Sequence, residues 1–391
     1  PKWKEVPPLF YVADYNYNTK EYEYFLSMYD ESYTDPISIT VDAELDAGNS
    51  EWIIPVKKVG NYPCSGWSNL TEVIVSEGIE KIGVGAFMDC ISLTNVVLPS
   101  GTNNYLYVEA KAFKGCTNLQ TIFCASKPWI VYYDTFTDCP TNMIIYYREG
   151  QEGWTNSTWE GFEVRSYPAA PQTISMPPME LSLAAQDGLK AYYKVTACDP
   201  EFAGELTIPY QFEPEEVQPP ESGELQLSYY IREIAEEAFK DHQGVNSVKI
   251  EEGVKEIGER AFAGCSNLTT IVIPEGVTAV ENEAFSHCTS LQSISLPDSV
   301  VRAGGKMLEE CSSLTSVKLS ASLPVLREEM FVGNTGLVSV EIPAQITELR
   351  SKIFENCSEL ESIIFAGNAP VAESETFLNC PENVIIYYNA G

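Results

Sequence analysis

The chain has 391 residues, 44% of them hydrophobic, so it can bury one extended core or two to three compact cores. It carries 24 Lys and Arg against 56 Asp and Glu, and this formal net charge of −32 would repel a phosphate backbone or an anionic membrane surface. We therefore exclude nucleic acid as a partner. No run reaches the roughly 18 to 20 apolar residues of a membrane helix, so the sequence predicts no transmembrane segment.

The N-terminal part is rich in aromatic and β-branched residues, which predict strands at residues 22–26 and 52–60. We expect these strands to form a β cap that covers the end of a repeat stack. The aromatic run at residues 11–25 suggests stacking on sugar rings, but its alternation also fits a cap strand. Residues 14–19 are similar to the start of a calcium loop, yet Phe25 stands where the closing Glu is needed, so we predict no calcium site.

A period of 23 residues organises the rest of the chain. In the second half, Phe or a close variant recurs at this interval at Phe239, Phe262, Phe285, Leu308, Phe331, Phe354 and Phe377. An earlier series holds Phe87, Phe113 and Phe136 at intervals of 26 and 23 residues, and three extra residues near 100–105 account for the longer interval. Such regular self-similarity predicts a solenoid of stacked repeats.

Residues 268–288 represent one repeat, with the pattern L-x-x-I-x-I-P-x-x-V-x-x-V-x-x-x-A-F-x-x-C. Ile271 and Ile273 alternate with Thr270 and Val272, which predicts a short strand with one buried face. The spacing of the later apolar residues predicts turns and a short helical or 3₁₀ segment on the opposite side. The fold expected is a right-handed α/β solenoid with short parallel strands on one side, in which each Phe lies on the Phe of its neighbours.

The chain also contains a longer duplication, because residues 135–147 and 376–388 are near copies. Strand-like stretches at 191–195, 206–210 and 229–239 precede the second series as the N-terminal ones precede the first. Between the two series lies a proline-rich stretch that favours an extended linker. We predict a first repeat module with an N-terminal β cap at 1–165, a linker at 166–180, and a second module with its own cap at 181–391.

Eight of the eleven cysteines share one position in the repeat: Cys90, Cys116, Cys139, Cys265, Cys288, Cys311, Cys357 and Cys380. Other repeats have Trp67, His242 or Asn334 there. A linear ladder without a C-x-x-C pair does not converge on a zinc ion, so we predict no metal site. Disulfides between neighbouring rungs are compatible with the expected spacing and with export. Buried free thiols are favoured, because the same position accepts other residues.

The sequence shows no G-x-S-x-G, H-E-x-x-H or phosphate-binding glycine loop, and only two histidines, His242 and His287. We predict no catalytic residue and no cofactor. An enzyme is the least favoured of the possible functions.

The outward face of the strands offers a column of mixed chemistry. Its members in the second module are Lys249, Val272, Ser295, Lys318, Glu341, Ile364 and Tyr387. Within this column we take four residues as candidate binding residues: Val272, Lys318, Glu341 and Ile364. The alternative is that this face has no binding role, since the small hydroxyl residues in the neighbouring column simply suit a parallel ladder.

These repeats, typified by GCSNLTTIVIPEGVTAVENEAF, resemble the BspA-like, treponemal-type leucine-rich repeats of 23 residues. The resemblance covers residues 52–147 and 229–388. The pattern of these repeats departs from that of commoner leucine-rich repeats, because a Pro follows the strand and the Cys lies three residues before the next Leu.

The resemblance implies an exported bacterial protein at the cell surface or outer membrane, where any lipid-anchor cysteine would lie upstream of Pro1. Several members of the family are associated with adhesion. The implied function is therefore non-enzymatic binding or adhesion to a host or microbial surface protein, and the alternative is a glycan-binding surface module.

Overall fold

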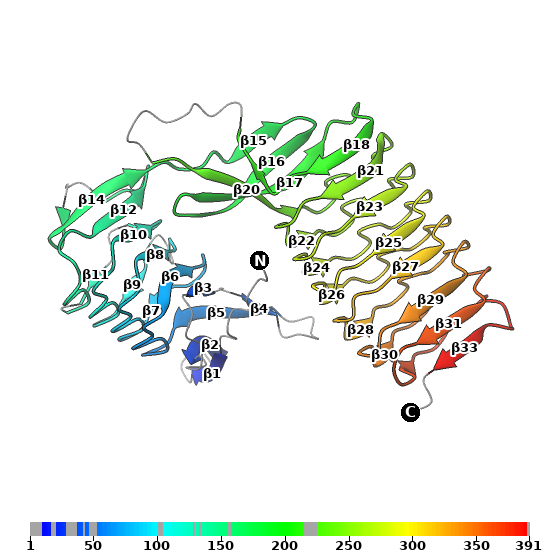
Figure 1. The fold of residues 1–391 in the computed structure, drawn as a ribbon, viewed down its shortest axis with the longest axis horizontal. Coiled ribbons are helices and arrows are strands. Elements are labelled where there is room, and N and C mark those ends of the chain that lie inside the picture. Colours follow the sequence, from blue (N-terminus) through cyan, green and yellow to red (C-terminus); the bar gives the residue numbers. More distant parts are fainter. Residues whose placement is uncertain are drawn as a thin grey trace. The chain divides into compact units, whose positions relative to one another are not determined.

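The computed structural model describes residues 10–16, 21–28, 37–41, 44–46, 53–100, 105–127, 130–132, 134–154, 158–214 and 225–388, and the side chains among these from residue 57 onward except 130 and 131. Two compact units make up the chain. The first contains residues 1–170, 186–190 and 220–227, and the second contains 171–185, 191–219 and 228–391. Each unit is a stack of coils in which strands of successive coils run side by side (Figure 1).

The first unit contains β1 (Phe10–Asn16), β2 (Glu21–Met28), β3 (Ile37–Val41), β4 (Glu44–Asp46), β5 (Ile53–Val59), β6 (Leu70–Val75), β7 (Lys81–Ile82), β8 (Asn95–Leu98), β9 (Tyr107–Val108), β10 (Thr121–Cys124), β11 (Ile130–Val131), β12 (Ile144–Arg148), β13 (Thr158–Trp159) and β14 (Phe162–Tyr167). Its longer strands form one sheet in the order β13-β14-β12-β10-β8-β6-β3. A second sheet has the order β1-β2-β5-β7-β9-β11, with β4 paired to β5. The pairs β1–β2 and β4–β5 are antiparallel, and the coils that follow pair in parallel.

The later strands are β15 (Thr173–Met176), β16 (Met179–Asp187), β17 (Lys190–Cys198), β18 (Gly204–Ile208), β19 (Gln211–Phe212), β20 (Ser228–Ile234), β21 (Val245–Ile250), β22 (Glu256–Ile257), β23 (Thr270–Val272), β24 (Ala279–Val280), β25 (Ser293–Ser295), β26 (Arg302–Ala303), β27 (Ser316–Lys318), β28 (Val325–Leu326), β29 (Ser339–Ile342), β30 (Glu348–Leu349), β31 (Ser362–Phe365), β32 (Val371–Ala372) and β33 (Ile385–Tyr388). The longer strands of the coils form two sheets, β18-β21-β23-β25-β27 and β29-β31-β33. The shorter ones form β15-β16-β17-β20-β22-β24-β26, with β19 on β20, and β28-β30-β32.

The return side of each coil differs from the sequence prediction. A short helical or 3₁₀ segment was expected there, but the part of the chain that the structure describes contains no helix. A two-residue strand such as β24 lies there instead, so strands occur on two sides of the coil and not on one.

The turn around each Phe explains why no helix forms. Glu283 and His287, two residues before and after Phe285, have positive φ values of 55° and 58°. Left-handed residues at both flanks stop a right-handed helix from propagating. The turn therefore closes through short bonds within the coil, such as Ala284 N to Glu281 O at 3.3 Å, and continues into the next coil through Phe285 N to Met307 O at 3.0 Å.

The core confirms the predicted phenylalanine ladder. Ring centroids of Phe262 and Phe285 lie 5.6 Å apart with nearly parallel planes, and those of Phe331 and Phe354 lie 5.5 Å apart. In the first unit, Phe87 and Phe113 are stacked at 5.6 Å. These six rings are completely buried. Each coil thus buries its aromatic ring against its neighbours, as a repeat that has no core of its own requires.

The division into 1–165, 166–180 and 181–391 stays a prediction. The stretch predicted as a linker includes β15 and the start of β16, which pair in an antiparallel manner. Residues 17–20, within the calcium-like run, lie outside the described residues, as do the side chains of the aromatic run at 11–25.

The ladder predicts very different costs for two neighbouring truncations. Phe285→Ala should lower the free energy of unfolding by about 3–5 kcal/mol, because it opens a cavity between two coils. Cys288→Ala removes one sulfur atom and one weak hydrogen bond and should cost about 1 kcal/mol. Chemical denaturation of both variants measures the difference, and equal losses would show that the thiol does more than fill space.

Candidate functional site

The long strands of the second unit turn alternate side chains inward and outward. In β23, Ile271 is buried while Val272 on the outer face is 56% exposed. Ile364 holds the same position in β31 and is 42% exposed. Lys318 and Glu341 are also exposed. The four predicted binding residues therefore occupy one position in four coils, on a solvent-facing surface.

Strand pairing aligns this column residue by residue within each sheet. Val272 lies beside Lys249 and Lys318 beside Ser295. Glu341 lies beside Ile364, and Ile364 lies beside Tyr387. The face therefore presents apolar, cationic and anionic groups in fixed order along the stack.

The column is interrupted at a seam between β27 and β29. The described residues show no strand pairing there, and the ladder of short strands also stops at β26 and resumes at β28. On the short-strand side, Pro324 supplies a local reason for the interruption between β26 and β28. In neighbouring coils Thr278 and Val301 donate their N–H groups at this position to the preceding coil, at 2.8 and 3.0 Å, whereas proline has no N–H to donate.

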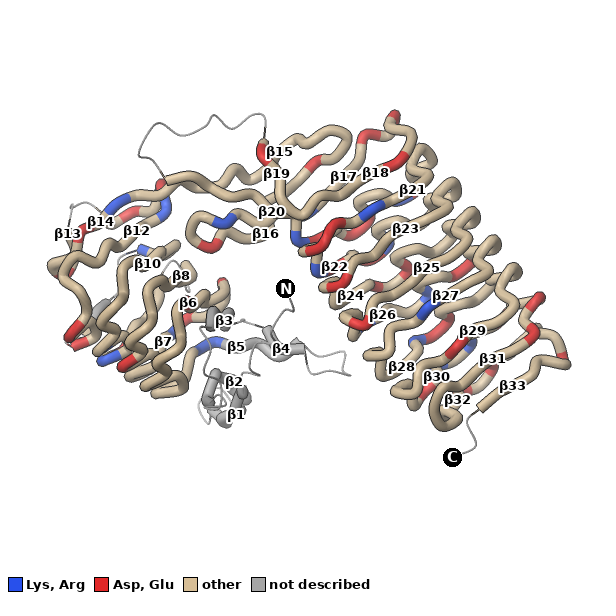
Figure 2. The backbone as a smooth tube through the Cα atoms, viewed as in Figure 1, with Lys and Arg blue, Asp and Glu red and all other residues tan. Residues whose placement is uncertain are grey.

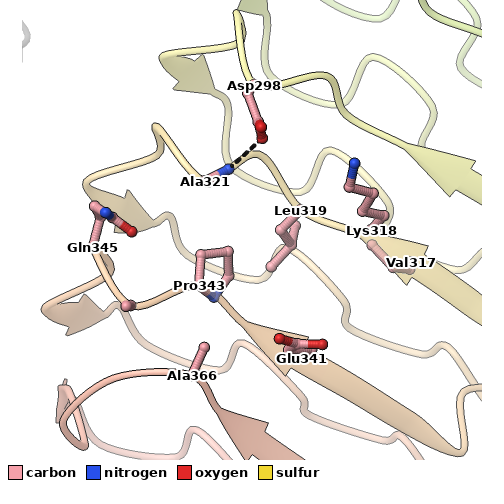
Figure 3. Close-up of a pocket in the computed structure, with 10 residues that line it drawn as sticks. Asp298, Val317, Lys318, Leu319, Ala321, Glu341, Pro343, Gln345 and Ala366 are labelled. Atoms are coloured by element: carbon pink, nitrogen blue, oxygen red, sulfur yellow. Dashed lines mark hydrogen bonds between the residues drawn. The ribbon is translucent and has the colours of Figure 1, made fainter.

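The coils stay joined on the turn side of the seam, where Leu308 N donates to Met330 O at 3.1 Å. Beside the seam, on the strand side, lies a hollow of about 400 Å³. It is lined by Asp298, Val317, Lys318, Leu319, Ala321, Glu341, Pro343, Ala344, Gln345 and Ala366. Figure 3 shows Lys318 and Glu341 on the strands that flank it, with Leu319 and Pro343 between them. The hollow thus combines an apolar floor with one cation and several polar groups.

A second hollow, of about 590 Å³, lies nearer the N-terminal cap of this unit. It is lined by Tyr210, Gln211, Lys249, Ile250, Glu251, Glu252, Val272, Pro274 and Glu275. Val272 therefore borders this hollow, while Lys318 and Glu341 border the one at the seam. Ile364 borders neither.

The corresponding face of the first unit is covered by its own chain. Its outward column contains Ile74, Val97, Phe123 and Tyr146, all at least nine-tenths buried. Leu189 and Leu225, which belong to the same unit, pack against this column. The turn at Gly188 sits so close that a Cβ there would lie 3.0 Å from the ring of Phe123.

Of the two long ladders, the one in the second unit is therefore the exposed one. The sequence analysis did not consider this difference, although the regular apolar column of the first module was a signal for it.

The shared cysteine position has a structural role that the sequence analysis missed. Each thiol donates a hydrogen bond to a carbonyl oxygen of the preceding coil, as Cys265 Sγ does to Phe239 O at 3.0 Å. The same bond recurs from Cys288 to Phe262, from Cys311 to Phe285, from Cys357 to Phe331 and from Cys380 to Phe354, at 2.9 to 3.2 Å. Asn334, at the equivalent position, donates from Nδ2 to Leu308 O at 2.8 Å. In these coils the position therefore holds a side chain that donates a hydrogen bond to the preceding coil.

Burial makes these thiols poor nucleophiles. It raises the pKa of Cys265, Cys311 and Cys357 to about 12 and holds that of Cys288 well above its ordinary value. The reactive thiolate is therefore suppressed at neutral pH. Among the described residues, no group of three or more His, Cys, Asp or Glu side chains is arranged to hold a metal ion.

The two histidines also have structural surroundings. His242 is buried, and its Nε2 lies 2.8 Å from Asp199 O. Its Nδ1 accepts hydrogen bonds from the N–H groups of Gly244 and Val245, at 3.2 and 3.3 Å. His287 is exposed in a turn with positive φ. These positions do not form a Cys-His dyad.

Stacked coils of this period, with Phe and Cys ladders inside and an open strand face outside, define a leucine-rich repeat solenoid. The family profile described as BspA type Leucine rich repeat region matches residues 50–157, 222–332 and 256–385. The chain therefore belongs to the BspA-type leucine-rich repeat family. The described part contains no helix with the length and hydrophobicity needed to cross a membrane.

Solved structures of similar proteins are distant in sequence. A leucine rich cell surface protein from Faecalibacterium prausnitzii A2-165 is 19% identical, covering 100% of this chain and 97% of its own, with a TM-score of 0.33. The T. pallidum Leucine Rich Repeat protein is 23% identical, covering 54% of this chain and 92% of its own, with a TM-score of 0.41. At these values the comparison adds no argument about function. No curated protein sequence matches the chain.

The first prediction from the ladder concerns the oxidation state. The eight ladder cysteines should be free and unmetallated, because their Sγ atoms point at backbone carbonyls of the preceding coil. Thiol counting on the purified protein under denaturing, non-reducing conditions measures this directly, and a count showing most of these thiols blocked would contradict it.

The second concerns alkaline stability. Folding raises the pKa of the Cys265 thiol from 9.0 to about 12. The stability that this shift contributes to the folded chain is therefore complete below about pH 9. As pH rises from 9 toward 12 the unfolded chain releases protons that the folded chain keeps, so stability falls, by about 1.4 kcal/mol per pH unit for each linked thiol.

Denaturant titrations at about pH 8 and about pH 10.5 would compare the wild type with a chain carrying Cys265→Ala, Cys311→Ala and Cys357→Ala. The triple variant should lose less stability over this range, because it lacks three of the linked thiols. Tyrosines also titrate at alkaline pH, but they are the same in both chains and so cancel in the comparison. An equal loss in both would contradict the role of the thiols.

Proposed function

We propose that this chain is a non-enzymatic, exported cell-surface protein that binds a surface protein of a host or another microbe through the strand face of its second unit. The observation that carries this proposal is the contrast between the two ladders. The first unit covers its outward column with its own residues, whereas Val272, Lys318, Glu341 and Ile364 remain open to a partner. Membership of a leucine-rich repeat family supports a binding role.

A solenoid face binds by distributed contact, because each coil contributes only one or two side chains. A partner lying along the ladder would meet Val272 beside one hollow and Lys318 and Glu341 beside the other. The apolar floors of these hollows would bury side chains of the partner, and a few such contacts would dominate the affinity.

Charge adds an expectation about association. Acidic residues are spread over the coils of both units (Figure 2), and the sequence carries a net charge of −32. A partner with a basic patch would associate faster at low salt, and the advantage would fade as the Debye length shrinks from about 10 Å at 0.1 M salt to about 3 Å at 1 M.

The alternative partner is a glycan, and Tyr210 is the observation that favours it. Its side chain borders the hollow beside Val272, together with Glu251, Glu252 and Glu275. An aromatic ring next to carboxylate acceptors provides apolar contact for a sugar ring and hydrogen bonds for its hydroxyl groups. Parallel screens against host matrix proteins and a glycan array would separate the two partner classes.

The test of the site is a chain in which Val272, Lys318, Glu341 and Ile364 are all replaced by Ser. Binding to a partner found in either screen should weaken tenfold or more, about 1.4 kcal/mol, because the variant removes the column's apolar and charged groups. Surface plasmon resonance or calorimetry measures the change.

A matched control replaces Lys255, Val301, Glu359 and Val371 by Ser. This set has the same chemistry, one cation, one carboxylate and two β-branched residues, and all four are exposed away from the long strands. Its affinity should stay within about twofold of the wild type. Unchanged binding in the column variant together with loss in the control would move the site off this face and defeat the proposal.

A further inference from the structure

Neighbouring coils join their surface charges in a regular way. At five places a Lys or Arg of one coil forms an ion pair with the Glu 23 residues later in the next coil, at 2.7 to 3.9 Å. These pairs are Lys57–Glu80, Arg260–Glu283, Lys306–Glu329, Arg350–Glu373 and Lys352–Glu375. Opposite charges one repeat apart are therefore close enough to pair at many points of the stack.

Lys318 and Glu341 are an exception to this rule. They have opposite charges and the same spacing of one repeat, and both side chains are exposed. Neither forms an ion pair with any residue that the structure describes. The strands that carry them, β27 and β29, belong to different sheets, so the pairing that would align the two side chains is missing. Both charges are thus open to groups from outside the chain.

Apolar surface lies beside these two charges. Both border the hollow of about 400 Å³ at the seam, which we call the seam hollow, and Leu319, Pro343 and Ala344 also line it. The remaining ionisable residue of its lining, Asp298, is engaged, because its carboxylate accepts a hydrogen bond from Ala321 N at 3.0 Å (Figure 3). The seam hollow therefore offers one unpaired cation, one unpaired anion and an apolar floor.

We propose that the seam hollow binds a segment of a partner protein in which an aliphatic side chain lies beside one acidic and one basic side chain. The acidic group pairs with Lys318, the basic group pairs with Glu341, and the aliphatic side chain enters the hollow against Leu319 and Pro343. This inference rests on the proposed function, since it gives the chemistry of the partner at one part of the same strand face.

Charge complementarity supports this occupant over a segment of one sign. The chain carries a net charge of −32, which repels an acidic segment. A basic segment is attracted to acidic groups all over the surface, but at the seam hollow Lys318 opposes it. A segment with both signs satisfies Lys318 and Glu341 together, and this match gives specificity more than raw affinity.

The direct test uses three blocked synthetic peptides that differ only in their charges. Each has a central Leu between two charged residues, which are Asp and Lys, two Asp, or two Lys, and each is flanked by Gly and Ser. Ligand-observed NMR titration measures their binding to the complete chain. The mixed peptide should bind with a dissociation constant of about 1 mM and roughly threefold or more tightly than the other two.

Substitution of either charge should switch this preference. Lys318→Glu surrounds the hollow with two carboxylates, so the peptide with two Lys should become the best ligand. Glu341→Lys does the opposite and should favour the peptide with two Asp. Replacing the central Leu of the mixed peptide by Gly should weaken its binding to the wild type, because the apolar contact is lost.

The matched controls are Lys255→Glu and Glu359→Lys. They make the same changes of charge at exposed residues away from the seam hollow. Both controls should keep the preference of the wild type for the mixed peptide. Nonspecific attraction to an acidic protein would instead rank the peptide with two Lys first on every chain.

The absence of an ion pair can be tested without a ligand. The changes in melting temperature caused by Lys318→Ser and Glu341→Ser should add in the double variant. For Arg260→Ser and Glu283→Ser, which break an ion pair of 2.7 Å, the sum should depart from additivity by roughly 1 °C or more. Similar coupling in both pairs would show that Lys318 and Glu341 already satisfy each other.

Other results would overturn the proposal as well. One is the absence of saturable binding of the mixed peptide up to about 10 mM. Another is a ranking of the three peptides that Lys318→Glu and Glu341→Lys leave unchanged. Binding of a sugar that both variants abolish, without any peptide preference, would assign the hollow to a glycan. A dimer of the chain that the mixed peptide dissociates would assign it to a second copy.

The peptide measurements need no whole partner, so they are independent of the test in which four column residues are replaced by Ser. Loss of partner binding in that variant, combined with no preference among the peptides, would keep the proposed function and reject this inference.

Discussion

The stacking of each coil's phenylalanine on that of its neighbours is the interaction on which the rest of the structure depends. A single coil of 23 residues cannot enclose a ring as large as Phe285, so the ring is buried only because coils lie above and below it. This requirement fixes the repeat length, since an insertion must leave the core positions in register. The three extra residues near 100–105 meet that condition, because Phe87 and Phe113 still stack at 5.6 Å.

The other periodic features follow from bringing successive coils to this spacing. The turn around each Phe is bracketed by left-handed residues, which lets backbone N–H groups point at the next coil instead of closing a helix. The thiol three residues after most of these Phe residues then gives a carbonyl of the preceding coil a second donor, as Cys288 does for Phe262 O, which also accepts from Cys265 N. Asn334 shows that the requirement is for a donor and not for sulfur. The inward positions are thus strongly constrained, and the outward positions are free to vary.

The 23-residue period was enough to predict the features that recur in every coil. Features that depend on packing between segments far apart in the sequence were not predicted. The strand at Thr270–Val272, the phenylalanine ladder and the buried cysteines followed from the repeat alone. The return side was predicted as partly helical because apolar spacing does not reveal backbone conformation, and the tolerance of left-handed φ at Glu283 and His287 was not considered. The covering of the first unit's strand face by Leu189 and Leu225 was out of reach, because these residues lie outside the repeats.

Several positions of the repeat change together at the place where the exposed face has its hollow of about 400 Å³. Around one coil, Leu308 replaces the phenylalanine, Ser320 stands where its neighbours have Pro297 and Pro343, and Pro324 removes a cross-coil donor. Asn334 replaces the cysteine in the same neighbourhood. Each change is tolerated because the turn side still holds the coils together through bonds such as Leu308 N to Met330 O. On the strand side β27 and β29 belong to separate sheets, and Lys318 and Glu341 both line the hollow there. A uniform solenoid offers only a flat ladder, so a local departure from the repeat is the simplest way for this fold to create a recess on its strand face.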